Sequence, residues 1–350
     1  MEKKRNIRDL SLEEMKVFFE EKGPQAFRAK QLYEWLWLKS ARTFDEMTNL
    51  SKDLRQLLVE HFELPAVQVA EEQISSDRTI KTAFKLFDGK ITEGVLIPSS
   101  KRMTACISSQ VGCSLTCKFC ATGKLKLMRN IQFDEIYDQV AIIKEQAEKH
   151  YNQNLTNIVY MGMGEPLLNY SQLLKSVERI TAADGLGMSP RRITVSTAGI
   201  AKLIRRLGDD EVKFNLALSL HAANDVKRSK IMPINDQNNL EILAEALQHY
   251  HKMTQNRVTF EYIIFKDFND ELEDARELAE FCKNVPCKIN LIEYNPIDDG
   301  EFQQADPQKV TDFANFLEDR NLVVNIRRSR GKDIDAACGQ LANKNGAVVA

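Results

Sequence analysis

From about residue 104 onwards, short runs rich in β-branched and other apolar residues alternate with longer stretches of helical periodicity. The runs lie at residues 105–108, 157–161, 192–196, 214–218, 258–264, 288–292 and 322–326. Such alternation is typical of parallel strands joined by crossover helices. Six or seven units predict an α/β fold with a partial barrel that is open on one side. Functional side chains are then expected after the strands, at their carboxyl ends.

The N-terminal part of the chain has a different pattern. Residues from about 10 to 62 have helical periodicity, beginning with Ser11 and, three residues later, Glu14. Residues 83–90 look like a strand that enters an Asp-Gly turn, with 94–98 as its partner. We therefore expect a helical accessory domain at 1–65, a small β-hairpin sheet at 66–98, the barrel core at 99–345 and a tail at 346–350.

The composition is that of an ordinary globular protein, with 43% hydrophobic and 28% charged residues among 350. No apolar run is long enough to span a membrane, and the basic start of the chain is not followed by the apolar stretch of a signal peptide. A cytoplasmic protein with no membrane partner is expected. The net charge of -2 argues against a protein that coats nucleic acid, but it allows a local basic face.

Three of the seven cysteines, Cys113, Cys117 and Cys120, lie within one short segment. Three thiolates at this spacing can hold three corners of a cubane iron–sulfur cluster, which leaves the fourth iron open to a small chelating molecule. Structural zinc sites usually have four ligands in two separated pairs, and no second pair follows here. A disulfide framework is not expected in a long chain without a secretory signal.

Polar residues follow several of the predicted strands. Gly162, Gly164 and Glu165 come after the second run, where glycines allow close backbone approach and a carboxylate can accept from an ammonium group. Ser196, Ser219, His221 and Asn295 stand at or just after later strands, where each can hydrogen-bond a ribose or a carboxylate. Taken singly, such residues are more often caps or turns. Their shared position makes the set a candidate binding site.

The remaining cysteines are of two kinds. Cys106 lies on the strand that leads into the three-cysteine segment, and Cys338 precedes Gly339 near the C-terminus, where a tight turn exposes its thiol. Cys282 lies in an apolar stripe and Cys287 directly precedes a strand, so both are expected to be buried structural thiols.

These motifs together resemble the RlmN/Cfr family of radical S-adenosylmethionine (SAM) enzymes, which methylate adenine carbons in RNA. The resemblance is carried by residues 113–123, 162–169, 189–192, 219–222, 232–235 and 333–341. It covers about 90–345 strongly. With Pro166, this segment is similar to the RlmN branch of the family, whereas Cfr-type proteins carry Ala at this position. The resemblance implies a partial barrel of six βα units with an N-terminal accessory domain.

The resemblance also implies cofactors and roles for individual residues. One [4Fe-4S] cluster is held by Cys113, Cys117 and Cys120, and two SAM molecules are used per turnover. The residues implied to contact SAM are Gly164, Glu165, Ser196, Ser219, Leu220, His221 and Asn295. Cys338 takes a methyl group from one SAM, and a 5′-deoxyadenosyl radical from the second SAM abstracts hydrogen from this S-methyl. The carbon radical adds to the base, Cys106 resolves the covalent link through a disulfide, and Glu93 is the general base.

The implied product is 2-methyladenosine, in 23S ribosomal RNA at the peptidyl-transferase centre and in transfer RNA beside the anticodon. A flavodoxin-like electron donor and a thiol reductant are implied, and a monomer is expected. Basic residues near both reactive ends suit an RNA substrate, although any one of them can be merely solvated. They are Lys118, Lys124, Lys126 and Arg129 beside the cysteine segment, and Arg327, Arg328, Arg330 and Lys332 before Cys338. Trp35 and Trp37 could stack on bases, but their helical spacing places at least one in the core.

Three other functions remain open at this point. A Cfr-like enzyme would use the same thiols to methylate carbon 8 of adenine, and analysis of the RNA product separates it from the carbon-2 enzyme. A non-catalytic iron–sulfur RNA-binding protein would not need a methyl-accepting thiol such as Cys338. A glycyl-radical activating enzyme would share the cluster motif but would lack the second pair of thiols.

Overall fold

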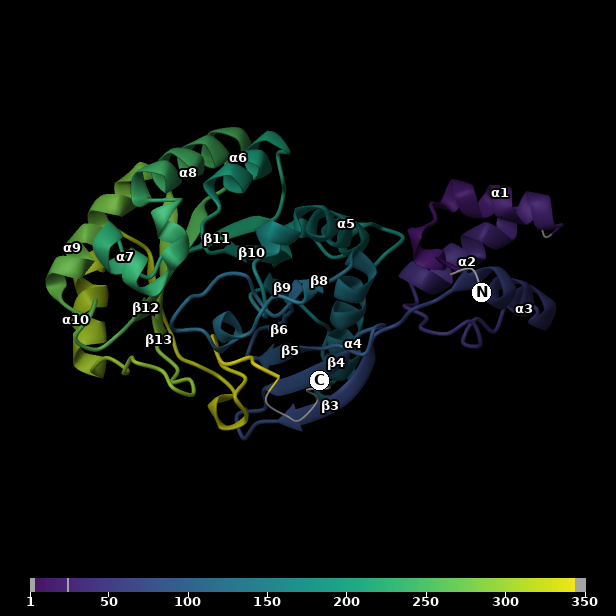
Figure 1. The fold of residues 1–350 in the computed structure, drawn as a ribbon, viewed down its shortest axis with the longest axis horizontal. Coiled ribbons are helices and arrows are strands. Elements are labelled where there is room, and N and C mark those ends of the chain that lie inside the picture. Colours follow the sequence, from purple (N-terminus) through teal and green to yellow (C-terminus); the bar gives the residue numbers. More distant parts are fainter. Residues whose placement is uncertain (1–3, 24, 344–350) are drawn as a thin grey trace.

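The computed structural model describes residues 4–23 and 25–343; the expected tail at 346–350 lies outside this range. One ten-stranded sheet forms the centre of the molecule, in the order β14-β13-β12-β11-β10-β9-β6-β5-β4-β3. The strands from β14 to β6 in that order are parallel, and β5, β4 and β3 continue the sheet antiparallel. The sheet curls into a partial barrel, with the helices of the crossover connections around its outside (Figure 1).

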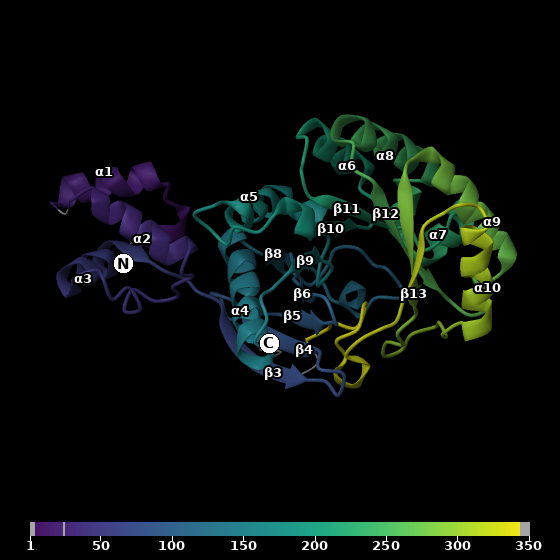
Figure 2. The same cartoon turned by 180° about the vertical axis from the view of Figure 1, so that it is seen from behind.

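Each of the seven predicted strand runs is confirmed as a parallel strand. Their bounds are β6 Met103–Cys106, β9 Asn157–Tyr160, β10 Ile193–Thr197, β11 Asn215–Ser219, β12 Val258–Ile264, β13 Cys287–Glu293 and β14 Val324–Arg327. The helices of this part are α4 Phe133–Tyr151, α5 Tyr170–Thr181, α6 Ala201–Asp209, α7 Asp225–Ile231, α8 Leu240–Thr254, α9 Leu272–Phe281 and α10 Pro307–Glu318. Helices α6, α8, α9 and α10 follow one another along the outer side of the curved sheet, as the view from behind also shows (Figure 2).

The predicted hairpin is part of this same sheet. Strand β4 (Ile80–Lys85) pairs with β5 (Ile91–Pro98) through the expected Asp-Gly turn, and β5 pairs with β6 of the barrel. A further strand that the sequence pattern did not indicate, β3 (Gln68–Ile74), pairs with β4 at the edge. Residues 68–98 therefore extend the barrel sheet on one side, and β5 is an inner strand.

The N-terminal part is helical, as predicted, with α1 Leu12–Lys22, α2 Phe27–Trp37 and α3 Lys52–His61. Ser11 and Glu14 form a reciprocal capping box at the start of α1. Two short parallel strands, β1 (Arg5–Asn6) and β2 (Phe62–Glu63), close this module. It stands to one side of the barrel, beyond α4 and α5 (Figure 1).

A buried ion pair joins the N-terminal module to the barrel. Arg8 Nη1 lies 2.9 Å from Asp138 Oδ2 on α4, and both side chains are fully buried. Trp37 is 1% exposed and stacks on Phe133, while Trp35 is half-buried beneath Lys39. The expectation that at least one tryptophan belongs to the core is thus confirmed for Trp37. Among the described residues, no helix combines the length and the apolar character that crossing a bilayer requires.

Candidate functional site

The three clustered cysteines lie on a loop whose base is closed by a small ribbon. Strands β7 (Gln110–Val111) and β8 (Arg129–Asn130) pair antiparallel and bracket residues 112–128. Gly112 begins the loop with φ +76°, and a Cβ at this position would lie 2.1 Å from the Lys126 carbonyl oxygen. Only glycine therefore allows the two ends of the loop to pass so closely.

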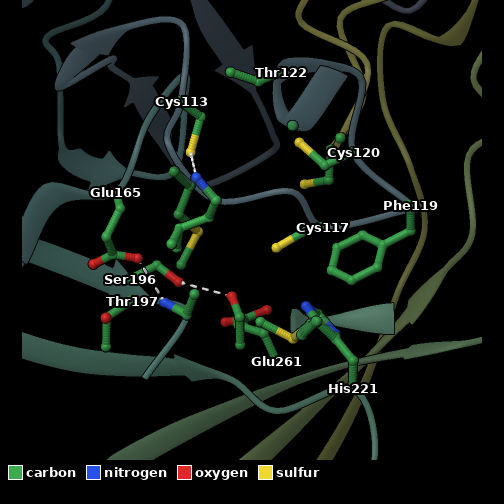
Figure 3. A pocket seen from close by; sticks show the side chains of 18 of the residues that line it. Cys113, Cys117, Phe119, Cys120, Thr122, Glu165, Ser196, Thr197, His221 and Glu261 are labelled. Carbon is green, nitrogen blue, oxygen red and sulfur yellow. Dashed lines mark hydrogen bonds between the residues drawn. The ribbon is translucent and has the colours of Figure 1, made fainter. Parts of the chain in front are cut away.

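The thiols of Cys113, Cys117 and Cys120 face one pocket at the carboxyl ends of the parallel strands (Figure 3). We call it the main pocket; besides these cysteines its lining includes Phe119, Gly162, Gly164, Glu165, Ser196, Ser219, His221, Glu261, Arg327 and Cys338. Among the described residues, no three His, Cys, Asp or Glu side chains are arranged to hold a metal ion. A single zinc ion needs every sulfur at ~2.3 Å. A cubane instead bonds each thiolate to a different iron, which suits three thiols spread around one hollow.

Burial keeps these thiols protonated in the protein alone. It raises the pKa of Cys113 to about 11, and it also raises the pKa values of Cys117 and Cys120. The neighbouring cysteines add to the shift, because three thiolates in one pocket would repel one another. A bound metal centre would supply the positive charge that three buried thiolates require.

The turn after β9 forms another side of the main pocket. Gly164 has φ +95°, and a Cβ at this position would lie 2.4 Å from Gln110 Cβ. Glu165 is 3% exposed; its Oε2 accepts from the Ala198 N–H at 2.7 Å and its Oε1 from the Leu167 N–H at 3.1 Å. Burial raises the pKa of Glu165, while these hydrogen bonds oppose the shift. A carboxylate fixed in this way can also accept from the ammonium group of a ligand.

The later strand ends bring four of the predicted residues together. Ser196 Oγ and Ser219 Oγ are 3.4 Å apart and both line the main pocket. His221 Nδ1 accepts from the Ile263 N–H at 3.1 Å, so its ring proton is on Nε2. Burial lowers the pKa of His221 to about 3, and the nearby Arg228 charge adds to this shift, so the ring is a neutral donor. Leu220 is fully buried behind this wall.

Cys338 lies where the main pocket meets a second one, the side pocket. The side pocket is lined by both Cys106 and Cys338, and by Ile97, Arg327, Arg328, Arg330 and Leu341 among others. Cys338 is exposed and followed by Gly339 at φ +83°, as the tight turn predicted, whereas Cys106 is buried. Burial raises the pKa of Cys106 to about 12; the charge of Cys338 adds to this and that of Arg327 opposes it.

The C-terminal segment that carries Cys338 is fastened to the cysteine loop. The Ala121 N–H donates to the Gly339 carbonyl at 2.7 Å, and Thr122 Oγ1 donates to the Leu341 carbonyl at 2.7 Å. Asn295 Nδ2 donates to the Cys338 carbonyl at 3.1 Å, while its buried Oδ1 has no partner among the described residues. Asn295 thus fixes the backbone of Cys338; it is 3% exposed and, within the described part of the chain, is not a lining residue of either pocket.

Glu93 occupies an unexpected position. The sequence alone indicates a charge at a hairpin edge, but Glu93 lies on the inner strand β5 and is 2% exposed. Its Oε2 accepts from the N–H groups of Ala342 and Asn343, and its Oε1 lies 3.6 Å from Lys81 Nζ. Within the described part of the chain, it is not a lining residue of either pocket. The C-terminal segment covers this carboxylate.

The basic residues near the site are not equivalent. Arg129 pairs with Asp88 and Glu135, and Arg327 Nη1 lies 3.2 Å from Glu261 Oε2. Lys124 donates to the Asp298 carbonyl, and Lys332 pairs with Glu293. Lys118, Lys126, Arg328 and Arg330 are exposed, and the last two line the side pocket. Exposed positive charge therefore gathers at the mouth of the side pocket.

Two cysteines lie outside both pockets. Cys282 is buried at the end of α9, and Cys287 is half-buried at the start of β13 with its Sγ 3.9 Å from the Cys282 carbonyl. Sequence reasoning missed other residues in the pocket wall, above all Glu261, which accepts from Asn290 and Arg327. A carboxylate inside the apolar run of β12 was the signal that could have revealed it.

The lining of the main pocket suits an iron–sulfur cluster, which is the group that closely spaced cysteines hold in other proteins. Three thiols surround one hollow, a buried carboxylate lies opposite them, and two serine hydroxyls and a neutral imidazole line the remaining wall (Figure 3). These groups suit an iron–sulfur centre beside a ligand that carries an ammonium group and a ribose. Consistent with this, residues 107–281 match the model of the Radical SAM superfamily. The protein is a radical SAM enzyme, and membership implies SAM and a [4Fe-4S] cluster as cofactors.

Relatives of higher sequence identity show to which family of radical SAM enzymes the chain belongs. Residues 5–64 match the model "Ribosomal RNA large subunit methyltransferase N-terminal domain". A "Probable dual-specificity RNA methyltransferase RlmN" of Cytophaga hutchinsonii is 60% identical over 98% of this chain and 94% of its own length. The "Dual-specificity RNA methyltransferase RlmN" of Campylobacter fetus is 40% identical over 97% of this chain and 99% of its own length. The chain belongs to the RlmN family of RNA methyltransferases.

A solved structure agrees with this membership. A radical SAM methyltransferase from Sphaerobacter thermophilus superposes with a TM-score of 0.91 at 38% identity, and the match covers 96% of this chain and 99% of that protein. The shared region includes the N-terminal module as well as the barrel.

Proposed function

We propose that this enzyme forms 2-methyladenosine in 23S ribosomal RNA and in transfer RNA, by way of an S-methylated cysteine. The observation that carries the proposal is the position of Cys338. Its thiol lines both pockets, so it can meet a methyl donor in the main pocket and a base in the side pocket. The names of the relatives support RNA as the substrate.

We assign the cluster to Cys113, Cys117 and Cys120, and SAM to the opposite wall. In this assignment Glu165 accepts from the SAM ammonium group, Ser196 and Ser219 bind its ribose, and His221 donates from Nε2. Gly164 allows close backbone approach, while Leu220 shapes the wall and Asn295 offers its free Oδ1. When bound, the cluster and SAM would supply an electron and a carbon-centred radical. The protein's own side chains carry out the methyl transfer, the proton abstraction and the release of the product.

Cys338 is the methyl carrier. Its thiolate attacks the methyl carbon of one SAM and becomes S-methylcysteine, and S-adenosylhomocysteine is the leaving group; a thiolate is a good nucleophile and adenine carbon 2 is not. Loss of one hydrogen atom from the S-methyl to the radical of a second SAM gives a carbon radical that adds to the base. Two SAM molecules are thereby consumed in one turnover.

Cys106 and Glu93 complete the reaction. Glu93 takes the proton from carbon 2 once the C-terminal segment uncovers it. Cys106 attacks the sulfur of Cys338, so that a disulfide forms as the sulfur–carbon bond to the product breaks. The released carbon takes up a proton to become the methyl group, and the unpaired electron of the adduct would pass back to the oxidised cluster. An external thiol reductant then restores both cysteines, and a flavodoxin-like protein supplies the electron. We expect the enzyme to act as a monomer in the cytoplasm, with Arg328 and Arg330 contacting RNA phosphates at the side pocket.

The test is mass spectrometry of nucleosides from RNA treated with reconstituted enzyme, SAM and a reductant. The expected product is 2-methyladenosine, from ribosomal fragments and from unmodified transfer RNA alike. Formation of 8-methyladenosine would assign the enzyme to the Cfr-like reaction. RNA binding without any cleavage of SAM would identify a non-catalytic binding protein, and formation of a glycyl radical on a partner protein would indicate an activating enzyme.

A further inference from the structure

Two arginines of this protein, Arg8 and Arg228, are almost completely removed from water. Arg8 is neutralised by Asp138 at 2.9 Å. Arg228, on helix α7, is 0% exposed, and the partners of its guanidinium are all uncharged oxygens. They are Ala198 O at 2.7 Å, the side-chain Oδ1 of Asn235 at 2.8 Å, Leu220 O at 3.1 Å and Ser219 O at 3.3 Å. Among the described residues, no hydrogen-bonded carboxylate neutralises Arg228.

A buried charge without a counter-charge is costly, so its position needs an explanation. Burial lowers the pKa of Arg228 to about 10, although the nearby charges of Cys117 and Asp225 act to raise it. The guanidinium therefore stays protonated near neutral pH. Carbonyl dipoles solvate the guanidinium but do not cancel its field. Asp225 is an exposed carboxylate that reaches the guanidinium only through Asn235. A further anion is therefore expected close to Arg228 when the protein is complete.

The cysteine loop is the element against which α7 ends. The Lys118 N–H, next to Cys117, donates to the Ile231 carbonyl on the last turn of α7 at 3.0 Å. On another side, Ala198 connects Arg228 to the pocket wall, because its carbonyl accepts from Arg228 while its N–H donates to Glu165. Arg228 therefore lies directly behind the wall of the main pocket, on the side of Cys117.

We propose that Arg228 is the built-in counter-charge of the iron–sulfur cluster and that it raises the cluster's reduction potential. The inference rests on the proposed ligation by Cys113, Cys117 and Cys120. Three thiolates give the bound centre a negative charge, and the electron taken from an external reductant makes it more negative. A fixed positive charge in a poorly screened interior stabilises the reduced form more than the oxidised form. In this proposal the positive charge of Arg228 acts on the cluster, in addition to the hydrogen bonds by which Arg228 holds the surrounding loops together.

Two kinds of variant distinguish the effect of the Arg228 charge from the effect of its hydrogen bonds. Arg228→Gln removes the charge and keeps some hydrogen bonds, whereas Arg228→Lys keeps the charge and loses most of them. The double variant Asp225→Asn with Asn235→Asp exchanges an amide and a carboxylate that are already hydrogen-bonded at 2.9 Å. The exchange leaves the net charge unchanged and keeps Arg228, but it places a carboxylate against the guanidinium. Lys230→Gln removes an exposed charge from the same helix and is the matched control.

The experiment is a potentiometric titration of the full-length protein after anaerobic reconstitution, followed by electron paramagnetic resonance in the absence of SAM. The midpoint potential should move to more negative values in Arg228→Gln and in the exchange variant, and should stay near the wild-type value in Arg228→Lys and Lys230→Gln. Wild-type midpoints in the first two variants overturn the inference, and so does a shift in Arg228→Lys as large as that in Arg228→Gln.

The exchange variant decides the question if Arg228→Gln does not fold, since it retains both Arg228 and the amide–carboxylate pair. Iron content and thermal unfolding are measured for each protein beforehand. Failure of the proposed ligation is recognised separately: a Cys117→Ala protein would then still load the cluster, whatever the midpoints of the Arg228 variants.

Discussion

The carboxylate of Glu93 accepts a hydrogen bond from the backbone N–H of Ala342 at 2.9 Å. The same oxygen accepts from Asn343, and the other lies near Lys81. An inner strand of the sheet is thereby joined to a segment about 250 residues later, a few residues beyond Cys338. The proposed base is covered by the segment that carries the proposed methyl carrier, so binding of RNA must displace this contact before a proton can be taken.

Replacement of Glu93 by Gln should separate the two halves of the reaction. The amide that replaces the carboxylate can still accept a backbone hydrogen bond, so the cluster and S-methylation of Cys338 should remain normal. Formation of 2-methyladenosine should fall by about 10²–10⁴-fold, the usual contribution of a general base. Peptide mapping and nucleoside analysis of the same samples measure both steps. Glu72→Gln, on the edge strand β3, is the control; a fully active Glu93→Gln protein would place the base elsewhere.

Replacement of Cys117 by Ala should abolish the cluster, because the three thiols of the loop are its proposed ligands. Anaerobic reconstitution of the wild-type protein should give about four irons per chain, as expected for a cubane. Cys282→Ala, at a buried thiol outside both pockets, should load normally. Iron analysis and visible absorption check both proteins. Full loading of a triple alanine variant, or zinc as the native metal, would contradict the proposal.

Replacement of Cys338 by Ala should leave the cluster intact and stop methyl transfer, since the displacement step loses its nucleophile. SAM should still be cleaved reductively, because the main pocket keeps its other groups. Peptide mass spectrometry of active wild-type protein should find the methyl group on Cys338. A methyl group on Cys282 or Cys287 instead would mean that another thiol is the carrier.

The barrel was predictable because its inner strands β6, β10, β11 and β12 are mostly buried and are rich in apolar residues. The cysteine site was predictable because its spacing is local. Strand β3 escaped prediction because its residues are mostly exposed or half-buried and show no regular alternation. Arg228 escaped because Lys227 and Lys230 surround it, and such a run usually indicates a solvated helix face. Only packing against Ala198 and Leu220 shows that it is buried.

The position of Glu93 could not follow from the sequence either, because its burial depends on a segment that is remote along the chain. The family resemblance pointed to Glu93, whereas the hairpin pattern indicated a charge at the edge of a hairpin. The structure explains the difference, since β5 pairs on both sides and the C-terminal segment covers the remaining carboxylate.

Replacement of Asp138 by Asn should loosen the N-terminal module. Asp138 Oδ2 accepts from Arg8 Nη1 at 2.9 Å and from the Val67 N–H at 3.0 Å, all within the core. Loss of the carboxylate removes the ion-pair partner of the buried Arg8 and leaves only the nearby charge of Asp134, which should lower the free energy of unfolding by up to about 3–5 kcal/mol. Asp45→Asn breaks the exposed pair with Arg55 and should cost about 0–1 kcal/mol. Urea denaturation compares the two; equal midpoints would contradict the role of the buried pair.

Replacement of Cys106 by Ala should trap the enzyme on its substrate. Cys106 lines the side pocket with Cys338, and its proposed task begins only after the base has been linked to the Cys338 sulfur. S-methylation and radical addition should therefore proceed, but the protein–RNA link has no exit without a second thiolate. The protein should accumulate as a covalent complex with RNA that runs slowly on denaturing gels. After ribonuclease treatment it should run close to the position of the unmodified chain, with the linked nucleotide still attached to Cys338.

A purely structural Cys106 predicts a different result. Truncation of a small buried side chain should then cost about 1 kcal/mol of stability and give no cross-link. The double variant Cys106→Ala with Cys338→Ala is the control for specificity, because it lacks the sulfur to which the base is joined and should run as free polypeptide. A Cys106→Ala protein that also runs free and still makes 2-methyladenosine at the wild-type rate would refute the resolving role.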